Sequence, residues 1–481
     1  MDSSARALLA TLCLSIAMSM AMVPIPFADS VGSVLGSVSF LCELDWDHDE
    51  FPFLYEESPR GPLVPAALRG VNPDPTGQRL MAFTSLGHKL AGVPTAALLV
   101  SPWWGSAPEV LTLRASQLTA GWTLLVIAGF LLATLRRVTP WAVPATAAAV
   151  FGSNLWPHLR QTAWSNQVAL VGVAALVWLA FRVREEGLTR RLALGIGAAV
   201  GWAVLSRVAA LLICAPILAA ILWEQRASLR KAGWILAAGL PFAALFFVDN
   251  AVHTGSPFRL TFAGVATDIA VRMGQDASAF GGRPLVGLAG LLVSPSRGLL
   301  VFSPWVLLAG PGAWRAWRDR DALRGALVLG VLAVLAVNAG YTDWWGASCW
   351  GPRRLLELLP AFALLSFDPA WGRDPPRWFR LLAPPLVAWS VFVGAIGYFA
   401  YDSRWDAAHE PLANVVSTEE GLRYDLEATE HYLWSIRDGV LVDALRRLPQ
   451  EGLQFGREAD FTLAVGKVVP APLPPCSVLR T

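Results

Sequence analysis

Residues 192–223 read LALGIGAAVGWAVLSRVAALLICAPILAAILW, and the only charged side chain in this stretch is Arg207. A single helix of that length would measure about 48 Å at 1.5 Å per residue, whereas the hydrocarbon core of a bilayer is about 30 Å thick. Two short helices that turn at Ser206-Arg207 fit this thickness. The stretch therefore favours two membrane-spanning helices with Arg207 near an interface, and one long helix is the alternative.

The composition of the whole chain agrees with a membrane environment. Of its 481 residues, 55 % are hydrophobic and 15 % are charged, whereas soluble domains have about 25 % charged residues. The 22 Trp often flank apolar runs, as in the aromatic belts at membrane interfaces. A soluble globular domain would have to expose this apolar surface to water, so we predict an all-α polytopic membrane protein.

Apolar runs of sufficient length recur along the chain, and about eleven of them are predicted to be transmembrane helices. The first is interpreted as a retained helix and not as a cleaved signal peptide, because Val23-Pro24-Ile25-Pro26 makes a poor small-residue cleavage site. Several runs are short and require local thinning of the bilayer. The predicted spans are 6–27, 118–135, 139–156, 164–182, 192–206, 208–223, 232–250, 297–313, 323–340, 355–368 and 381–401.

Basic residues on the connections predict the orientation. Five clusters lie on alternate, short connections, which all fall on one side when the spans are counted as above. Basic connections prefer the cytoplasm, so the N-terminus is predicted inside and the C-terminus outside. The clusters are Arg136/Arg137, Arg182/Arg184/Arg190/Arg191, Arg226/Arg230/Lys231, Arg315/Arg318/Arg320/Arg324 and Arg373/Arg377/Arg380.

The chain is predicted to have two parts. Residues 1–401 form the transmembrane domain, whose first outer loop covers 29–114, and residues 402–481 form a short extracytoplasmic C-terminal tail. Within the first outer loop, 31–42 and 82–102 are apolar enough to lie along the membrane surface.

Acidic residues gather in the first outer loop. Asp29 ends the first span, where a carboxylate serves either as a helix cap or as a general base. Asp47, Asp49 and Glu50 belong to a run of five acids, which repel one another unless they are solvated, paired or bound to a cation. Trp46 among them favours a sugar, since aromatic faces stack on sugar rings. A solvated loop, carbohydrate binding and a divalent cation on Asp47 and Asp49 stay open.

Cationic residues recur at the outer ends of the spans, whereas the span centres contain almost no ionisable groups. A transporter is expected to carry such groups in mid-membrane, so the distribution favours an enzyme that works at the outer face. Each cation alone is explained as an interface anchor, whereas several in one cavity could hold a phosphate. The residues at the span ends are Arg207, Arg297, Arg353 and Arg354, and Lys89, just before an apolar run in the first outer loop, could join them.

Several short sequence motifs follow one another along the chain. They are Asp29-Ser30, LDWDHDEFP at 44–52, FGSNLW at 151–156 with QTAW at 161–164, Asp249-Asn250 before GSP at 255–257, LVSPSRGLLVFSP at 292–304, WWGASCWGPRR at 344–354 and the stretch 430–448. Together they resemble the GT-C superfamily of membrane glycosyltransferases, in particular bacterial relatives of the protein mannosyltransferase and aminoarabinose transferase families. Ala347 and Arg354 depart from the Gly and the aromatic residue that are usual in the tryptophan loop.

The resemblance implies a GT-C-like fold and an activity. The expected reaction transfers a hexosyl or pentosyl group, with inversion, from a polyprenyl-phosphate donor to a glycan, lipid or protein of the cell envelope. Asp29 would deprotonate the acceptor hydroxyl, with Asp47, Asp49 and Glu50 as further candidates. The five cations named above would bind the donor phosphate.

The resemblance also implies the surroundings of the site. Trp46, Trp344 and Trp345 would contact the sugar, and no cofactor is implied with certainty beyond an optional divalent cation. The expected location is the bacterial inner membrane, with the active site on the extracytoplasmic side and no nucleic-acid partner.

Other classes of membrane protein stay open. A transporter or flippase would move a lipid-linked substrate without forming a bond. An oligosaccharide ligase is expected to have one large outer loop late in the chain, whereas the acid-rich loop here is the first. A non-catalytic membrane scaffold is the remaining alternative.

Overall fold

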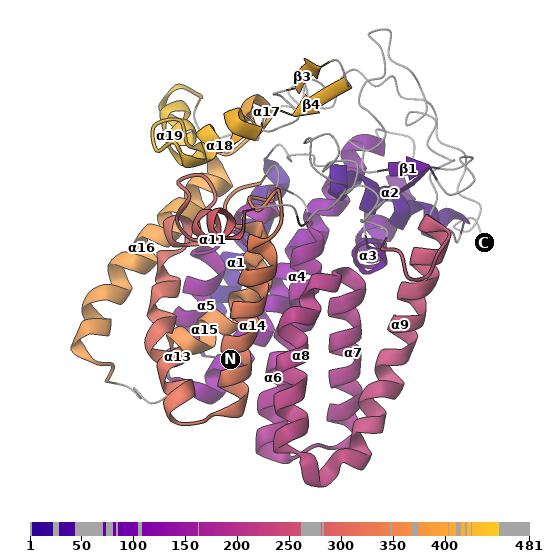
Figure 1. The fold of residues 1–481 in the computed structure, drawn as a ribbon, viewed down its shortest axis with the longest axis vertical. Coiled ribbons are helices and arrows are strands. Elements are labelled where there is room, and N and C mark those ends of the chain that lie inside the picture. The colour runs from indigo at the N-terminus through magenta and orange to yellow at the C-terminus, as the bar shows by residue number, and fades with distance from the viewer. Residues whose placement is uncertain are drawn as a thin grey trace.

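The computed structural model describes most of the chain. The described residues are 2–22, 28–43, 71–73, 80–82, 85–103, 108–161, 163–260, 280, 283–346, 349–367, 374–402, 404–409, 415–418, 421–424 and 426–451. Figure 1 shows a bundle of roughly parallel helices with shorter elements gathered at one end.

Six helices in the described part of the chain are long and apolar enough to cross a membrane. This agrees with the prediction of an α-helical membrane protein, because lipid requires every backbone polar group to be paired within the span. The six are α1 (Ser3–Ala21), α4 (Pro108–Val138), α6 (Ser165–Glu186), α9 (Ala232–Thr254), α14 (Ala322–Ala339) and α16 (Arg377–Phe399).

Shorter elements complete the bundle and cover one end of it. The bundle contains α5 (Ala142–Phe151), α7 (Arg190–Ser206), α8 (Leu211–Glu224), α11 (Pro284–Val293), α12 (Leu299–Phe302), α13 (Ala309–Arg318) and α15 (Leu359–Ser366). The remaining elements are α2 (Ala28–Glu43), α3 (Leu86–Trp103), α17 (Arg404–His409), α18 (Leu426–Trp434) and α19 (Val440–Glu451), with the antiparallel pairs β1 (Val71–Pro73)–β2 (Leu80–Ala82) and β3 (Val415–Thr418)–β4 (Gly421–Tyr424).

The long apolar stretch breaks at Arg207, as its length predicts. α7 ends at Ser206, a short 3-10 turn follows, and α8 begins at Leu211. Side-chain contacts show in which direction α6, α7 and α8 run. The amide of Asn166, at the start of α6, donates to the carbonyl oxygen of Arg353 at 2.7 Å, and Arg184, at the end of α6, forms an ion pair with Glu224 at the end of α8. α6 and α8 therefore run in the same direction. α7, which connects them in sequence, runs in the opposite direction.

The basic connections meet at one end of the bundle, which we call the arginine-rich end. Arg136 contacts Asp2 at 2.9 Å, Arg137 contacts Glu185 at 3.1 Å, and Arg184 contacts Asp321 at 2.6 Å. These ion pairs join the start of α1 to the end of α4, α4 to α6, and α6 to the start of α14. Six exposed tryptophans lie at the same end, namely Trp141, Trp223, Trp234, Trp314, Trp317 and Trp378.

Several predicted spans are shorter or more broken than expected. The predicted span 297–313 is divided among α12, a 3-10 helix that begins at Pro304, and α13. The predicted span 355–368 begins as a 3-10 helix after Pro352 and continues into an eight-residue α15. Proline has no backbone N–H to donate, which breaks the α-helical ladder. The fold is that of an α-helical membrane protein, and the number of about eleven spans stays a prediction.

Glycines let three helices approach closely. A Cβ on Gly172 of α6 would lie 2.5 Å from the carbonyl oxygen of Ala199 in α7. A Cβ on Gly197 of α7 would lie 2.1 Å from the carbonyl oxygen of Ile235 in α9. Small residues of this kind bring helix backbones together where lipid provides no hydrophobic drive for association. α6, α7 and α9 therefore form one closely packed layer.

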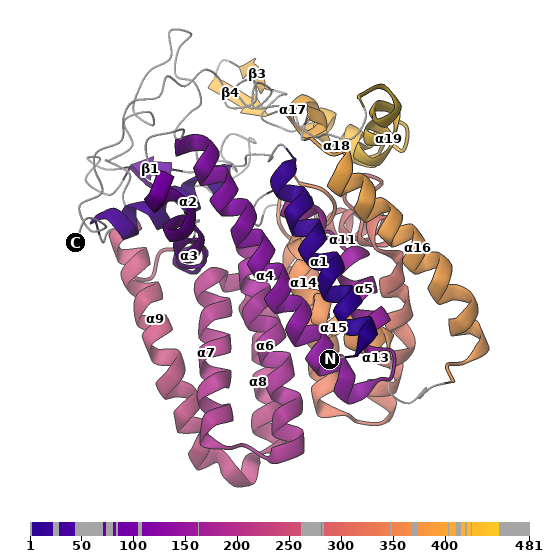
Figure 2. The same ribbon diagram turned by 180° about the vertical axis from the view of Figure 1, so that it is seen from behind.

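α2 and α3 lie at the end opposite the arginine-rich one. They pack against each other and against α4, and α3 also contacts α6, α7 and α9. Figure 2 shows both helices beside the upper ends of α4, α7 and α9. Both come from the predicted first outer loop, so this loop covers the helix ends where the candidate cations are found.

Candidate functional site

Small residues of α2 and α3 create the space for a buried lysine. A Cβ on Gly36 would lie 3.2 Å from Cδ of Lys89, and one on Gly92 would lie 2.4 Å from Oγ of Ser37. The Ser37 hydroxyl donates to the carbonyl oxygen of Lys89 at 2.6 Å. The Lys89 side chain therefore runs along the surface of α2 that Gly36 leaves open, and it is completely buried.

The Lys89 amine ends beside two residues of α9. Nζ of Lys89 lies 3.0 Å from Nε2 of His253 and 4.0 Å from Oδ1 of Asp249. Because Lys89 can only donate, Nε2 of His253 must accept, which leaves the proton on Nδ1. That nitrogen lies 3.3 Å from Oδ1 of Asp249 and 2.8 Å from its carbonyl oxygen. Burial lowers the pKa of Lys89, whereas the Asp249 carboxylate acts in the opposite direction.

His88, the neighbour of Lys89, connects α2 to the chain just before α6. Its Nδ1 lies 2.8 Å from the hydroxyl of Ser33, and the ring also hydrogen-bonds to the backbone of Ala163. Burial lowers the pKa of His88 to about 4, so the ring is neutral at pH 7. A neutral ring can accept from Ser33 while it donates to Ala163.

The buried His88 predicts a pH-dependent stability. An unfolded histidine titrates near 6.5, so the unfolded chain binds the proton more tightly than the folded protein. The contribution of His88 is fully present above about pH 6.5 and is lost as the pH falls toward 4, by up to about 3 kcal/mol. We expect the thermal unfolding temperature to fall across this window, and His88→Gln to reduce the slope. His431→Gln, on the exposed surface of α18, is the control and should leave the slope unchanged. An equal slope in the His88 variant and the wild type would contradict the assignment.

Three arginines meet at the same end of the bundle. Nη1 of Arg207 lies 3.2 Å from Oε1 of Glu357, and Nη2 of Arg354 lies 2.6 Å from Oδ2 of Asp343. Arg353 stacks on the ring of Trp164, with its guanidinium carbon 4.0 Å from the ring centre. Arg207 also interacts electrostatically with both other arginines. The three arginines and two carboxylates leave one positive charge in excess, in a partly buried position.

The start of α3, one helical turn before Lys89, contacts the turn that carries Arg207. The hydroxyl of Ser85, just before α3, donates to the carbonyl oxygen of Ser206, which precedes Arg207. A Cβ on Gly87 would lie 2.4 Å from Oγ of Ser206, so the start of α3 sits directly on the α7–α8 turn. On the other side of α3, the backbone of Ala163 hydrogen-bonds to His88. The next residue, Trp164, is the one on which Arg353 stacks. We call Lys89, Arg207, Arg353 and Arg354 the cationic layer.

His158 lies at the edge of the cationic layer. It is completely buried, and in the described part of the chain neither ring nitrogen has a hydrogen-bond partner. Its ring centre lies 6.2 Å from that of Trp164, and Arg353 is close enough to affect its titration. Burial, with a smaller effect from Arg353, lowers the pKa of His158 to about 3. An unpartnered buried imidazole is costly, which marks this position as one for a water molecule or ligand.

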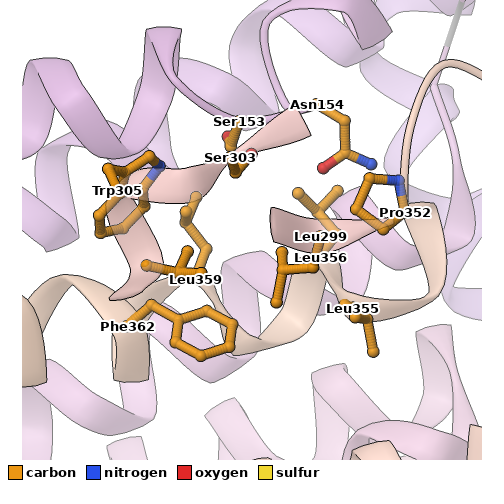
Figure 3. A pocket seen from close by; sticks show the side chains of 11 residues that line it. Ser153, Asn154, Leu299, Ser303, Trp305, Pro352, Leu355, Leu356, Leu359 and Phe362 are labelled. Carbon is orange, nitrogen blue, oxygen red and sulfur yellow. The ribbon is translucent and has the colours of Figure 1, made fainter. Parts of the chain in front are cut away.

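A small cavity is lined by Pro352, the residue that precedes Arg353 (Figure 3). Its volume is about 20 Å³, and it is lined by apolar side chains with Ser153, Asn154 and Ser303 as the polar ones. Nδ2 of Asn154 is buried and has no hydrogen-bond partner among the described residues. The volume suits one water molecule and not a sugar.

Arg297 belongs to a different arrangement. It is buried and forms an ion pair with Asp406, which also accepts a hydrogen bond from the Tyr401 hydroxyl. The hydroxyl of Ser294 donates to the carbonyl oxygen of Leu433 at 2.7 Å. The SPSRG block therefore fixes α17 and α18 on the bundle. Arg297 takes part in this contact through its ion pair with Asp406, and it does not belong to the cationic layer.

The other predicted site residues are located as follows. Asp29 lies in the first turn of α2, one helical turn before Ser33, and its side chain is outside the described residues, as are Trp46, Asp47, Asp49 and Glu50. Trp344 and Trp345 are buried, and Trp344 packs on Gly290 and lies 6.0 Å from Trp434. No group of three or more metal-binding side chains occurs among the described residues.

Sequence reasoning did not assign a role to several residues that the structure places here. In the sequence, Asp249 stands out only as part of a motif, and no pattern marks His253, Glu357, Asp343 or His158. Their partners lie far away in sequence, so no local pattern identifies them.

Comparison with known proteins adds no relative. No protein-family model, no curated protein and no solved structure matches this chain. The motifs and the geometry of the cationic layer are therefore the features from which a function can be proposed.

Proposed function

We propose that this chain is an integral membrane glycosyltransferase that transfers a sugar from a polyprenyl-phosphate donor to an acceptor of the cell envelope. The observation that supports it best is the cationic layer. Arg207 and the Arg353-Arg354 pair come from distant parts of the chain and lie close together, and α3, which carries Lys89, contacts the turn just before Arg207. Buried guanidinium groups are strong ligands for phosphate.

The layer suits the leaving group of such a reaction. When the acceptor hydroxyl attacks the anomeric carbon, the bond from that carbon to the phosphate oxygen breaks and its electrons pass to the polyprenyl phosphate. The developing negative charge is stabilised by fixed cations, more strongly in a buried site than in water. Glu357 and Asp343 hold Arg207 and Arg354 in place. A single displacement inverts the configuration at the anomeric carbon.

The position of α2 supports Asp29 as the base. Ser33 lies one turn after Asp29 and binds His88, which adjoins Lys89. The first turn of α2 is thereby held near the cationic layer. A carboxylate in this position would remove the proton of the acceptor hydroxyl as the new bond forms. Asp47, Asp49, Glu50 and a divalent cation remain further candidates in the same loop.

We further propose that the arginine-rich end faces the cytoplasm of a bacterial inner membrane. The basic connections and the N-terminus lie at that end, and basic connections are retained inside. The cationic layer then faces the extracytoplasmic side, where a lipid-linked donor and an envelope acceptor would meet.

The experiment that tests the function is mass spectrometry of envelope glycans and lipid-linked sugars from a deletion strain and its parent. Loss of one sugar from one glycan, with accumulation of its polyprenyl-phosphate form, is the expected result and would name donor and acceptor together. An unchanged glycome, combined with flux of a labelled lipid-linked sugar into proteoliposomes, would overturn the proposal in favour of a transporter.

A further inference from the structure

Five cations at the arginine-rich end form a patch that the proposed reaction does not use. They lie at the start of α7 and on the connection between α8 and α9, and all five side chains are exposed. Within the described residues none of them forms an ion pair, unlike most arginines nearby. We call Arg190, Arg191, Arg226, Arg230 and Lys231 the α7/α9 basic patch.

The patch is a consequence of helix packing. Close approach at Gly197 holds α7 against α9, which brings the first residues of both helices together at the lower end of the bundle in Figure 1. The guanidinium carbon of Arg190 lies 3.9 Å from the ring centre of Trp234. Two segments about 40 residues apart in sequence thus present one basic surface.

The acids near the patch are already paired. Glu224 binds Arg184, Glu185 binds Arg137 at 3.1 Å, and Glu186 binds Arg182 at 2.5 Å. Residues 187–192 and 225–234 contain no acid at all. The five charges are therefore not neutralised by this part of the protein, and they attract anions from outside it.

The surroundings of the patch match a lipid and not a soluble anion. Trp223 and Trp234 are exposed beside it, and tryptophan prefers the depth of lipid headgroups. Directly beyond Trp234, α9 exposes a row of apolar side chains, with Leu236 75 % and Leu240 68 % exposed. Charge, interfacial tryptophan and apolar helix follow one another along α9, which is the order of phosphate, glycerol and acyl chain in a phospholipid.

We propose that the α7/α9 basic patch is a binding site for anionic phospholipid. The headgroup phosphate contacts Arg190, Arg230 and Lys231, the indole of Trp234 lies at the glycerol level, and the acyl chains lie along the exposed surface of α9. Clusters of four to eight basic residues beside a membrane helix commonly bind anionic lipids. The site is independent of the proposed transferase activity.

The test measures lipid binding to the purified protein in detergent micelles. Phosphatidylglycerol and phosphatidylcholine are titrated separately, and bound lipid is followed by native mass spectrometry and by thermal stabilisation. The wild type is expected to bind phosphatidylglycerol more tightly than phosphatidylcholine. The double variant Arg230→Gln/Lys231→Gln should weaken phosphatidylglycerol binding about 25-fold, since each charge contributes about fivefold, and should leave phosphatidylcholine binding unchanged.

A matched control removes two charges at the same end that are already paired. Arg182→Gln/Arg318→Gln changes the net charge equally, and its partners are Glu186 and Asp319. Phosphatidylglycerol binding should stay within about twofold of the wild type. Inorganic phosphate at millimolar concentration should not compete, because it lacks acyl chains. Equal loss in both double variants, no preference of the wild type for the anionic lipid, or full competition by phosphate would each overturn the proposal.

Discussion

Replacing Arg297 by methionine is expected to destabilise the folded protein by about 3–5 kcal/mol, because it leaves the buried Asp406 carboxylate without its cation. Both side chains are only 1 % exposed. Arg297 also donates to the carbonyl oxygen of Ser296 at 2.9 Å, and its guanidinium carbon lies 5.2 Å from the ring centre of Trp405. Fluorescence-detected thermal unfolding in detergent measures the loss, and limited proteolysis should show that α17–α19 detach first.

Two further variants identify the cause. Arg318→Met removes an arginine whose partner, Asp319, is exposed, and it should leave the unfolding temperature unchanged. Arg297→Met/Asp406→Leu removes both charges and should recover much of the lost stability, because a buried ion pair is often replaceable by apolar groups of similar volume. A loss below about 1 kcal/mol in Arg297→Met would mean that the tail is held by other contacts and that Arg297 is free for another role.

The same residue illustrates the limit of sequence reasoning. In sequence, Arg297 belongs with the other cations, because each lies at the outer end of a predicted span or, for Lys89, just before an apolar run, and each could hold a phosphate. The structure pairs it with Asp406, more than one hundred residues later in the chain. No periodicity or spacing specifies that partner, since ion pairs between distant segments depend on how the helices pack. Arg207 differs because the length of its apolar stretch alone required a turn there.

Breaks within the helices are a second feature that could not be predicted from the sequence. Hydropathy identifies apolar segments of the chain, and these agree with the helices of the bundle. It does not distinguish a continuous span from one interrupted by 3-10 turns, as at Pro304 and Pro352. Irregular backbone at membrane depth is tolerated where other helices surround it. α13, α15 and α16 pack around the segment at Pro304, and α6, α14 and α15 pack around the segment after Pro352. The fold class was therefore predictable, whereas the number of spans depends on tertiary packing.

The buried polar contacts of the site were the least predictable part. The cationic layer was expected from charge placement at helix ends, and three of its four members, Arg207, Arg353 and Arg354, are linked by electrostatic interaction. The contacts that Lys89 makes with Asp249 and His253 require α3 to lie over the end of α9, which depends on Gly36 and Gly87. A glycine in sequence reveals nothing about the residue that fills its space.

Replacing Asp29 by asparagine is expected to lower sugar transfer about 10²–10⁴-fold, which is the usual contribution of a general base. Asparagine has nearly the size and shape of aspartate, and the lost charge in the first turn of α2 costs at most about 0.3–1 kcal/mol. α2 should therefore keep its position over Lys89, and the unfolding temperature should stay close to that of the wild type. The measurement is the rate of transfer from the polyprenyl-phosphate sugar that the deletion strain accumulates, in membranes with equal amounts of protein.

The choice of asparagine separates the two interpretations of Asp29. If Asp29 only stabilises the first turn of α2, Asp29→Asn should keep full activity, whereas Asp29→Ala should lose stability and activity together. If it is the base, both variants are inactive and only the alanine variant is less stable. Asp2→Asn is a matched control at the arginine-rich end, where Asp2 caps α1 by accepting from the backbone N–H of Ala5 at 2.7 Å. It should be fully active, because it lies at the other end of the bundle from the cationic layer.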